Sequence, residues 1–285
     1  MKRPSCAVLT IWWRLVIALA PVSLLWLLIP APLAGQSAEE LQERWVLDKY
    51  SLSVSGRFNS LDTKFRVDSD ELGVGTEVDA EDFLGLDSED TNWDVQGEIR
   101  LGRNHVFSGQ YADYVRENSR VIDREITIGE SVFPINTEVR TEYDIETVSF
   151  SYRYYPWVEE TWALGFGLGL RWYDFTLNLA TDELDRHEDA GVSAPMPFAG
   201  ADLRVALSPR FRLNGSAGFF DVELGDLGGT QILAEGALEY LVLPYLAVGA
   251  GVDIGRFDGE ASGDNWTGAI DTDVYGLRLF AKLRS

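Results

Sequence analysis

Apolar and polar residues alternate along most of the chain beyond residue 45. In the clearest segment, every second residue is apolar or glycine and those between are polar or charged: Trp93, Val95, Gly97, Ile99 and Leu101 against Asp94, Gln96, Glu98 and Arg100. Successive side chains of a β-strand point to opposite faces, so this period of two is typical of strands with one apolar face. The pattern returns at residues 50–58, 203–207, 232–240 and 275–283. We therefore predict an all-β protein.

Ten segments show this alternation: 48–66, 91–103, 105–126, 134–155, 161–179, 192–208, 210–225, 229–243, 245–258 and 268–284. Short connections contain residues that suit tight turns, such as proline and asparagine, and fall at 102–105, 155–160, 208–210 and 243–245. The longer ones are 67–90, 127–133, 180–191, 226–228 and 259–267, of which 127–133 also suits the tip of a protruding hairpin. An even number of strands places both chain ends on one side. Eight strands is the alternative, if two neighbouring segments are misread.

The segment 162–172 indicates what surrounds the apolar face. Six apolar residues share that face, with a tryptophan at each end: Trp162, Leu164, Phe166, Leu168, Leu170 and Trp172. A strand of this length, with a rise of ~3.3 Å per residue and a tilt of ~40°, spans roughly 25 Å along the membrane normal, the height of the apolar band of an outer-membrane barrel. We therefore predict a closed antiparallel transmembrane β-barrel with lipid outside and a polar lumen, rather than a soluble sandwich.

The opposite face of this segment carries only small residues, namely Ala163, Gly165, Gly167 and Gly169. This leaves room for bulky or paired lumen side chains from neighbouring strands. The glycines alternate strictly within a strand and no helix follows them, so they do not form a phosphate-binding loop.

The N-terminus has the layout of a signal peptide. Lys2, Arg3 and Arg14 precede an apolar run at 15–28, and small residues and prolines follow, which predicts cleavage between residues 34 and 38. The apolar stretch 15–34 is also long enough for a retained membrane helix, but its prolines disfavour a helix. The predicted domains are a signal peptide at 1–36, a short periplasmic segment at 37–47 and an outer-membrane β-barrel at 48–285.

Charge and cysteine content narrow the possible partners. The formal net charge is −22, and the predicted leader contains basic residues but no acidic ones, so the mature chain is still more acidic. Nucleic-acid binding is excluded, because neutralising phosphates requires clustered lysine and arginine. The single cysteine, Cys6, falls in the leader, so we expect no disulfide and no cysteine-ligated metal in the mature chain.

With these features together, the chain resembles the small outer-membrane β-barrel proteins of Gram-negative bacteria, the OmpA-like and porin-like class, over residues 45–285. The resemblance implies outer-membrane lipid, lipopolysaccharide and the outer-membrane assembly machinery as partners. Members typically end on an aromatic residue, whereas the last strand here contains Phe280 and finishes on Ser285.

The chain offers few groups for catalysis. His105 is predicted in a periplasmic turn, as an ordinary polar turn residue, and His187 in the outer loop at 182–189. The spacing Asp185-x-His187 is similar to the acid and histidine pair of omptin-type surface proteases, and Asp87 to Asp90 offer carboxylates for the other side of the barrel. No serine-hydrolase elbow or zinc-protease motif is present. We predict no enzyme activity, and no catalytic, cofactor-binding or metal-binding residues.

The long acidic loop at 68–90 is predicted to be solvated. Its ten carboxylates are dense enough to bind Ca²⁺ or Mg²⁺ and to bridge these divalent cations to lipopolysaccharide phosphates, although the spacing of an EF-hand is missing. The apolar stretch 83–86 within it is predicted to fold over the barrel mouth as a lid.

Charged residues of both signs occupy the inward face: Arg57, Asp94, Glu98, Arg100, Arg171, Asp202, Arg204, Arg212, Glu235, Glu239, Arg278 and Lys282. In a narrow lumen opposite charges should pair, because an unpaired buried charge is costly. The sequence therefore predicts a largely plugged barrel with a structural or surface-interaction role in the cell envelope. The alternatives are a narrow porin-like channel for ions or small solutes, and a surface enzyme such as an omptin-like protease or a lipid A modifier.

Overall fold

The computed structural model describes residues 46–69, 77–128, 131–181, 186–224, 227–262 and 266–285. The chain divides into two units, Met1–Leu41 and Gln42–Ser285, and all described residues belong to the second. The predicted signal peptide at 1–36 lies outside the described residues, as do residues 37–45 of the predicted periplasmic segment. No helix in the described ranges is long and apolar enough to cross a membrane.

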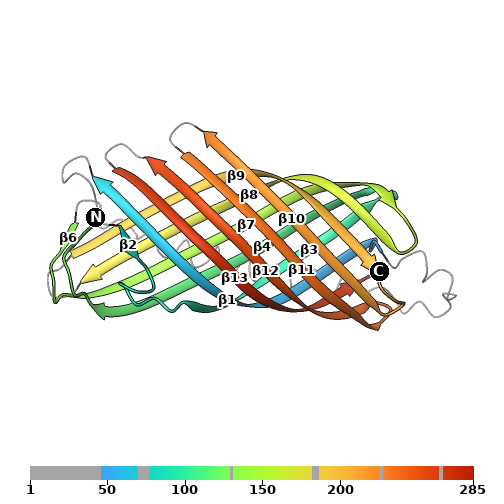
Figure 1. The fold of residues 1–285 in the computed structure, drawn as a ribbon, viewed down its shortest axis with the longest axis horizontal. Helices are drawn as coiled ribbons and strands as arrows, with labels where there is room; N and C mark the ends of the chain where they lie inside the picture. Colours follow the sequence, from blue (N-terminus) through green and yellow to red (C-terminus); the bar gives the residue numbers. More distant parts are fainter. Residues whose placement is uncertain (1–45, 70–76, 129–130, 182–185, 225–226, 263–265) are drawn as a thin grey trace, which may run out of the picture. The chain divides into compact units, whose positions relative to one another are not determined.

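The described chain is built from strands (Figure 1). They are β1 (Tyr50–Ser69), β2 (Val78–Asp79), β3 (Glu89–Leu101), β4 (His105–Val121), β5 (Ile126–Ile128), β6 (Ser131–Phe133), β7 (Glu138–Val158), β8 (Trp162–Thr181), β9 (Arg186–Ala206), β10 (Phe211–Leu224), β11 (Leu227–Leu243), β12 (Leu246–Ser262) and β13 (Trp266–Arg284).

Ten of these strands form a closed antiparallel barrel. The order around the wall is β1, β3, β4, β7, β8, β9, β10, β11, β12 and β13, and β13 pairs back onto β1 from Ser51↔Arg284 to Ser69↔Trp266. The two-residue strand β2 extends the edge of β1, and β5 pairs with β6 in a separate hairpin. The prediction of a ten-stranded closed barrel is confirmed, and the eight-stranded alternative is wrong.

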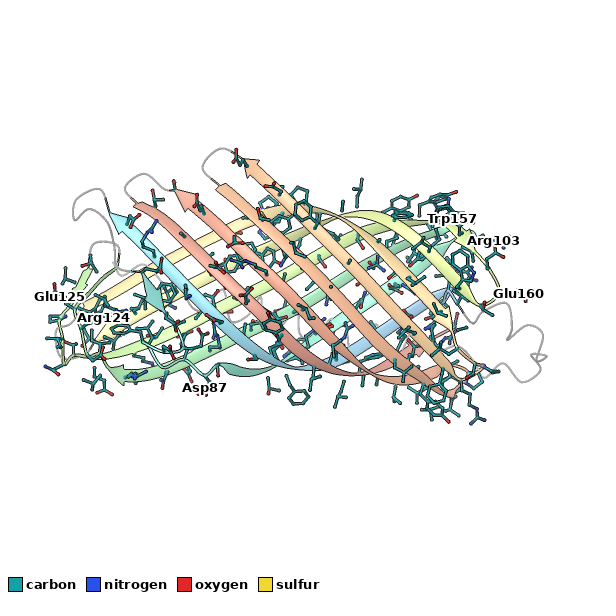
Figure 2. All side chains as sticks on the ribbon, in the orientation of Figure 1. Asp87, Arg103, Arg124, Glu125, Trp157 and Glu160 are labelled. Atoms are coloured by element: carbon teal, nitrogen blue, oxygen red, sulfur yellow. The ribbon has the colours of Figure 1, made fainter. Side chains whose placement is uncertain are left out.

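The wall has two distinct ends, because the connections differ in length. Residues near both ends of the described chain meet at one end, where the Lys49 amide donates to the Ser285 carbonyl at 2.8 Å. Trp157, Arg103 and Glu160 mark this end in Figure 2, and Arg124 and Glu125 mark the opposite one. Since outer-membrane barrels have short periplasmic turns and longer outer loops, the first is the periplasmic end and the second the outer end.

The outward face of the barrel is apolar over its membrane-spanning part. Side chains there are large and exposed, as in Phe150 (66%), Leu168 (68%) and Leu277 (61%). Trp162 and Trp172 lie at the two ends of their stretch of β8, both pointing outward as predicted. A surface of this kind requires lipid around it, because a soluble monomer rarely exposes so large a continuous apolar area.

The apolar face changes sides in the outer part of the strands. Along β8, the outward apolar run ends at Trp172, and the next apolar residues, Tyr173, Phe175, Leu177 and Leu179, are buried inside. The outward positions between them are Asp174, Thr176 and Asn178. This is the pattern of a water-soluble β-sheet, so the barrel extends beyond the membrane into water.

The same reversal occurs on the other side of the barrel. On β1, outward Val54 and Phe58 give way to outward Asp62 and Lys64, while Phe65 is buried inside. On β12, the outward residues Arg256 and Asp258 form an exposed ion pair at 3.2 Å. The sequence analysis did not detect this change, because it assigned one medium to each face for the whole length of a strand.

An apolar core fills the outer part of the barrel. Besides inward strand residues, it includes Phe83, Leu84 and Leu86 from the segment after β2, and Ile126 and Phe133 from the β5–β6 hairpin. Residues 83–86 were predicted to form a lid, with packing between loops as the alternative, and their burial against both the wall and the hairpin fits either interpretation. The loop at 127–133 is part of the β5–β6 hairpin, which was one of the two interpretations left open.

Two of the predicted connections are wrong. The loop expected at 180–191 is mostly strand, since β8 runs to Thr181 and β9 begins at Arg186. The turn expected at 155–160 starts later, because β7 continues to Val158 with an irregular register between Tyr154 and Trp157. Proline lacks an amide proton, and this irregularity accommodates Pro156 within the end of the strand.

The glycine stripe of β8 is covered by bulky side chains from its neighbours, as predicted. A Cβ atom on Gly165 would lie 2.8 Å from the Tyr155 ring, and one on Gly169 would lie 2.3 Å from the Phe198 ring. These contacts are too close for any other residue without repacking.

We predict that Gly169→Ala destabilises the barrel by about 1–3 kcal/mol, the usual cost of overpacking a filled core. Its matched control is Gly56→Ala, where a Cβ meets nothing within 4 Å. Equilibrium unfolding in urea in lipid vesicles, followed by tryptophan fluorescence, measures both. Equal stability of the two variants would contradict the packing described here.

Candidate functional site

The lumen is the only extensive polar surface that the described strands enclose, and three clusters of charged side chains cross it. The first two link strands that lie several places apart around the wall, and the third joins neighbouring strands from β3 through β1, β13 and β12 to β11. We describe them from the periplasmic end outward as the first, second and third clusters.

The first cluster is centred on Asp48, which precedes β1 and enters the barrel end. Its carboxylate accepts from Arg212 at 2.9 and 3.1 Å, and from Arg284 at 2.7 Å. Arg212 also pairs with Glu239, whose second oxygen accepts from Lys282 at 2.7 Å. Arg212, Asp48 and Glu239 are almost fully buried. The end of the predicted periplasmic segment, Val46 and Leu47, is buried beside this cluster.

Asp48 lies outside the membrane-spanning strands and its charge is held by its neighbours. Burial by itself would raise the pKa of the Asp48 carboxyl, but the positive charges of Arg212, Arg284 and Lys282 outweigh it and lower that pKa below its ordinary value. The Asp48 carboxylate is therefore a fixed negative charge near neutral pH.

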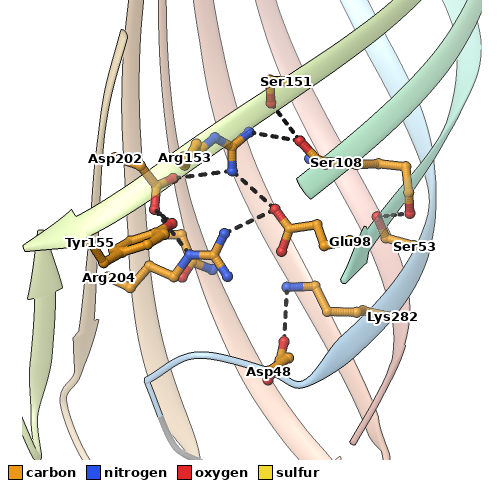
Figure 3. Close-up of polar contacts among 12 residues, drawn as sticks. Asp48, Ser53, Glu98, Ser108, Ser151, Arg153, Tyr155, Asp202, Arg204 and Lys282 are labelled. Atoms are coloured by element: carbon orange, nitrogen blue, oxygen red, sulfur yellow. Dashed lines mark hydrogen bonds and ion pairs between the residues drawn. The ribbon is translucent and has the colours of Figure 1, made fainter. Parts of the chain in front are cut away.

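The second cluster joins β3, β7 and β9 (Figure 3). The Glu98 carboxylate accepts from Arg153 at 3.0 Å and from Arg204 at 2.9 Å. Arg204 also donates to Asp202 at 3.1 Å, and the Tyr155 hydroxyl donates to the same carboxylate. A planar guanidinium can serve two carboxylates at once, so these residues form a continuous layer.

The third cluster lies nearer the middle of the barrel. Arg57 of β1 donates to Asp94 of the neighbouring strand β3 at 2.7 Å and to Asp253 of β12, on the other side of β13, at 2.8 Å. Arg278 lies 3.4 Å from Glu235 and 3.6 Å from Asp253. Each carboxylate here faces at least one guanidinium, as the cost of an unpaired buried charge requires.

Only small spaces separate these side chains. The cavities that they line have volumes of about 80, 90 and 130 Å³. Each has room for a few water molecules. The prediction that opposite charges in the lumen pair is confirmed for these three clusters.

A further ion pair anchors the segment after β2 within the outer part. Arg116 of β4 pairs with Glu81, donates to the Thr63 hydroxyl at 2.9 Å and lies over the Tyr143 ring at 5.1 Å. Glu81, which the sequence analysis assigned to a solvated acidic loop, is thus mostly buried in this contact.

The residues considered as catalytic candidates do not come together in the part of the chain that the structure describes. His105 is exposed at the start of β4, where its Nδ1 lies 2.8 Å from the Tyr152 hydroxyl. His187 belongs to strand β9, opposite Ala180, and not to a loop as expected. Asp185 lies outside the described residues, so the predicted Asp185-x-His187 pair has no described geometry. Asp87 is exposed at the outer end, where Figure 2 labels it.

Within the described ranges, no group of three or more histidine, cysteine, aspartate or glutamate residues is placed to hold a metal ion. Residues 70–76 of the acidic loop lie outside those ranges. The proposed binding of divalent cations to that loop is therefore still a hypothesis.

Sequence reasoning missed several cluster residues. Arg153 and Asp253 alternate with outward residues along their strands, as the other lumen residues do. The alternation alone could therefore have identified them. Asp48 was assigned to the first position of the strand at 48–66 and Tyr155 to the boundary between a strand and a turn, and their burial follows only from how the barrel end closes.

Comparison with known proteins supports the fold. The outer membrane protease OmpT from Escherichia coli matches with a TM-score of 0.52 and 13% identity, covering 83% of this chain and 96% of that one. The translocator domain of the autotransporter NalP from Neisseria meningitidis matches with a TM-score of 0.41 and 10% identity, covering 87% and 93%. The outer membrane protein OprG from Pseudomonas aeruginosa matches with 0.39 and 12%, covering 84% and 98%. No protein-family model and no curated protein matches the chain.

The closed wall, the lipid-facing outer surface and the charged interior define a transmembrane β-barrel. The chain is an integral β-barrel protein of the bacterial outer membrane, and the likeness to OmpT concerns the fold alone.

We predict that Asp48→Asn destabilises the barrel by about 3–5 kcal/mol at neutral pH, because it removes the buried anion that Arg212 and Arg284 share. The matched control is Asp258→Asn, whose ion pair with Arg256 is exposed, and which should cost at most about 1 kcal/mol. Unfolding in guanidinium chloride in lipid vesicles measures both. Similar losses would contradict a special role for the buried cluster.

The pH dependence of this difference follows from the lowered pKa of Asp48. A carboxyl with a lowered folded pKa contributes its full stability above the unfolded pKa of about 4 and loses it as the pH falls toward the folded pKa. The gap in stability between wild type and Asp48→Asn should therefore be constant from pH 8 to 5 and shrink below about pH 4.

Proposed function

We propose that this protein is a sealed, non-enzymatic barrel that serves envelope structure or surface interaction rather than transport along its axis. The supporting observation is the set of three charged clusters in the lumen, of which those around Asp48 and Glu98 link strands that lie far apart around the wall. A permeating ion would have to break several buried ion pairs, each of which costs several kcal/mol when one partner is lost.

The outer end supports the same proposal. Phe83, Leu84 and Leu86 pack inward above the charged clusters, so an aqueous path along the axis would also cross an apolar core. Outer-membrane lipid, lipopolysaccharide and the assembly machinery are the partners we propose, and divalent cations at the acidic loop would link it to lipopolysaccharide phosphates.

We expect the purified wild-type protein to give no steady conductance in planar lipid bilayers. A variant that combines Arg153→Ala, Tyr155→Ala and Arg204→Ala removes most of the second cluster but should also stay silent, because the first and third clusters and the apolar core still close the path. Heat-modifiable migration on gels verifies that both proteins are folded. Steady conductance of the folded wild type would favour the porin-like alternative and overturn this proposal.

The surface-enzyme alternative is tested directly. We expect no cleavage of a mixed peptide library and no change in lipid A when the folded protein is incubated with each. If cleavage occurs and is abolished by His187→Ala but retained in His105→Ala, the omptin-like hypothesis is correct and the non-enzymatic proposal is wrong.

A further inference from the structure

A cavity of about 100 Å³ lies inside the outer part of the barrel, above the charged clusters. It is lined mainly by apolar side chains and glycines from seven strands of the wall, including Phe65, Phe175, Met196, Phe257, Ala261 and Ile270. Only two charged residues, Arg66 and Glu260, are on its lining, and Arg66 already pairs with Asp68 at 3.2 Å. This space lies apart from the ion pairs that seal the lumen.

The chemistry of this cavity selects a hydrocarbon. Apolar cavities stay empty of water, and one of about 150 Å³ binds benzene, so about 100 Å³ accommodates a short run of methylene groups. The lining offers no unpaired buried charge for a polar head group. An occupant would therefore enter with an apolar end and leave any polar part outside.

The way along the barrel axis is covered. The β5–β6 hairpin reaches across the outer mouth, with β5 beside β1 and β6 beside β9. Ile126 and Phe133 of this hairpin are fully buried, together with Leu84 from the segment after β2. An occupant has to come from the side.

The wall is incomplete on one side at this height. Strands β9 and β10 pair from Ala206↔Arg212 only to Ala199↔Phe219, although β9 extends to Arg186 and β10 to Leu224. Figure 1 shows these two strands diverging toward the outer end. We call this unpaired stretch the β9–β10 seam. Pro195 and Pro197 lie on it, and proline has no amide proton to complete a ladder.

The seam begins on the membrane side of Trp172, since Ala199, the last β9 residue paired with β10, pairs on its other side with Leu168 of β8. Trp172, the last outward apolar residue of β8, pairs with Pro195. Tryptophan is enriched at this boundary in outer-membrane barrels, so the tails of outer-leaflet lipids lie next to the lower end of the seam.

Met196 lies between the seam and the cavity. Its side chain is buried and reaches across to β11, where its Cε is 3.3 Å from the position a Cβ would take on Gly229. Methionine is flexible and polarisable and adapts to irregular apolar surfaces. It can therefore rotate to admit a chain without breaking a hydrogen bond.

We propose that the cavity binds the end of a saturated hydrocarbon chain of an outer-leaflet lipid, which enters sideways through the β9–β10 seam past Met196. This goes beyond a sealed barrel, since it assigns a ligand site to the outer part while the axial path stays closed. The apolar lining provides the affinity, and the seam provides access directly from the membrane.

The test uses Met196 as its own probe, because Met1 is the other methionine of the chain. The full protein, refolded in lipid nanodiscs with ¹³C-methyl methionine, gives a Met196 signal that Met196→Leu identifies. Lipids with a nitroxide at the end of the acyl chain should broaden this signal, and free decane should shift it to saturation.

Two variants fill the cavity from opposite walls, Ala194→Phe and Ala261→Phe, and both should lose most of the nitroxide broadening and the decane shift. The matched control Ala281→Phe adds the same volume to the exposed outer face of β13 and should retain both. If the nitroxide still broadens the Met196 signal unchanged in both cavity variants, it acts from the lipid outside the wall and not from within the cavity. This result would overturn the proposal. A decane shift without lipid-dependent broadening overturns the lipid as source, and the absence of both effects overturns the site itself.

Discussion

The whole structure depends on the contact of lipid with one face of every membrane-spanning strand. Lipid cannot hydrogen-bond to a peptide group, so each amide and carbonyl in the apolar band must find a partner in a neighbouring strand. Closure of β13 onto β1 meets this requirement, because it leaves no free edge in the membrane. The apolar exterior, the even strand number and the meeting of the start of β1 with the end of β13 at one side all follow from that closure.

Closure also determines what the interior contains. Ten strands enclose a space that side chains can fill, and where the exterior is lipid the interior carries the polar residues. Charges gathered there are poorly hydrated, and each needs an opposite charge within reach. The clusters around Asp48, Glu98 and Arg57 meet that need by joining strands that lie far apart in the sequence.

Above the membrane the constraint is reversed. Once water replaces lipid outside, polar residues stabilise the outer face and the apolar ones turn inward, as Tyr173 to Leu179 show on β8. Water can hydrogen-bond to unpaired peptide groups, so strands in this part need not all be paired. That freedom allows β9 and β10 to separate and leaves an apolar cavity beside a gap in the wall.

The sequence alone determined the strand count, the outward apolar face and the inward charges, because a period of two is a local property that each strand displays by itself. It also indicated that Gly165 and Gly169 make room for bulky neighbours. Only the tertiary structure decided which neighbours, since register between strands places Tyr155 and Phe198 over those glycines. It likewise decided that Asp48 enters the barrel end, that Glu81 pairs with Arg116, and that β9 separates from β10. These contacts join residues distant in the chain, and alternation within one strand carries no information about its partner.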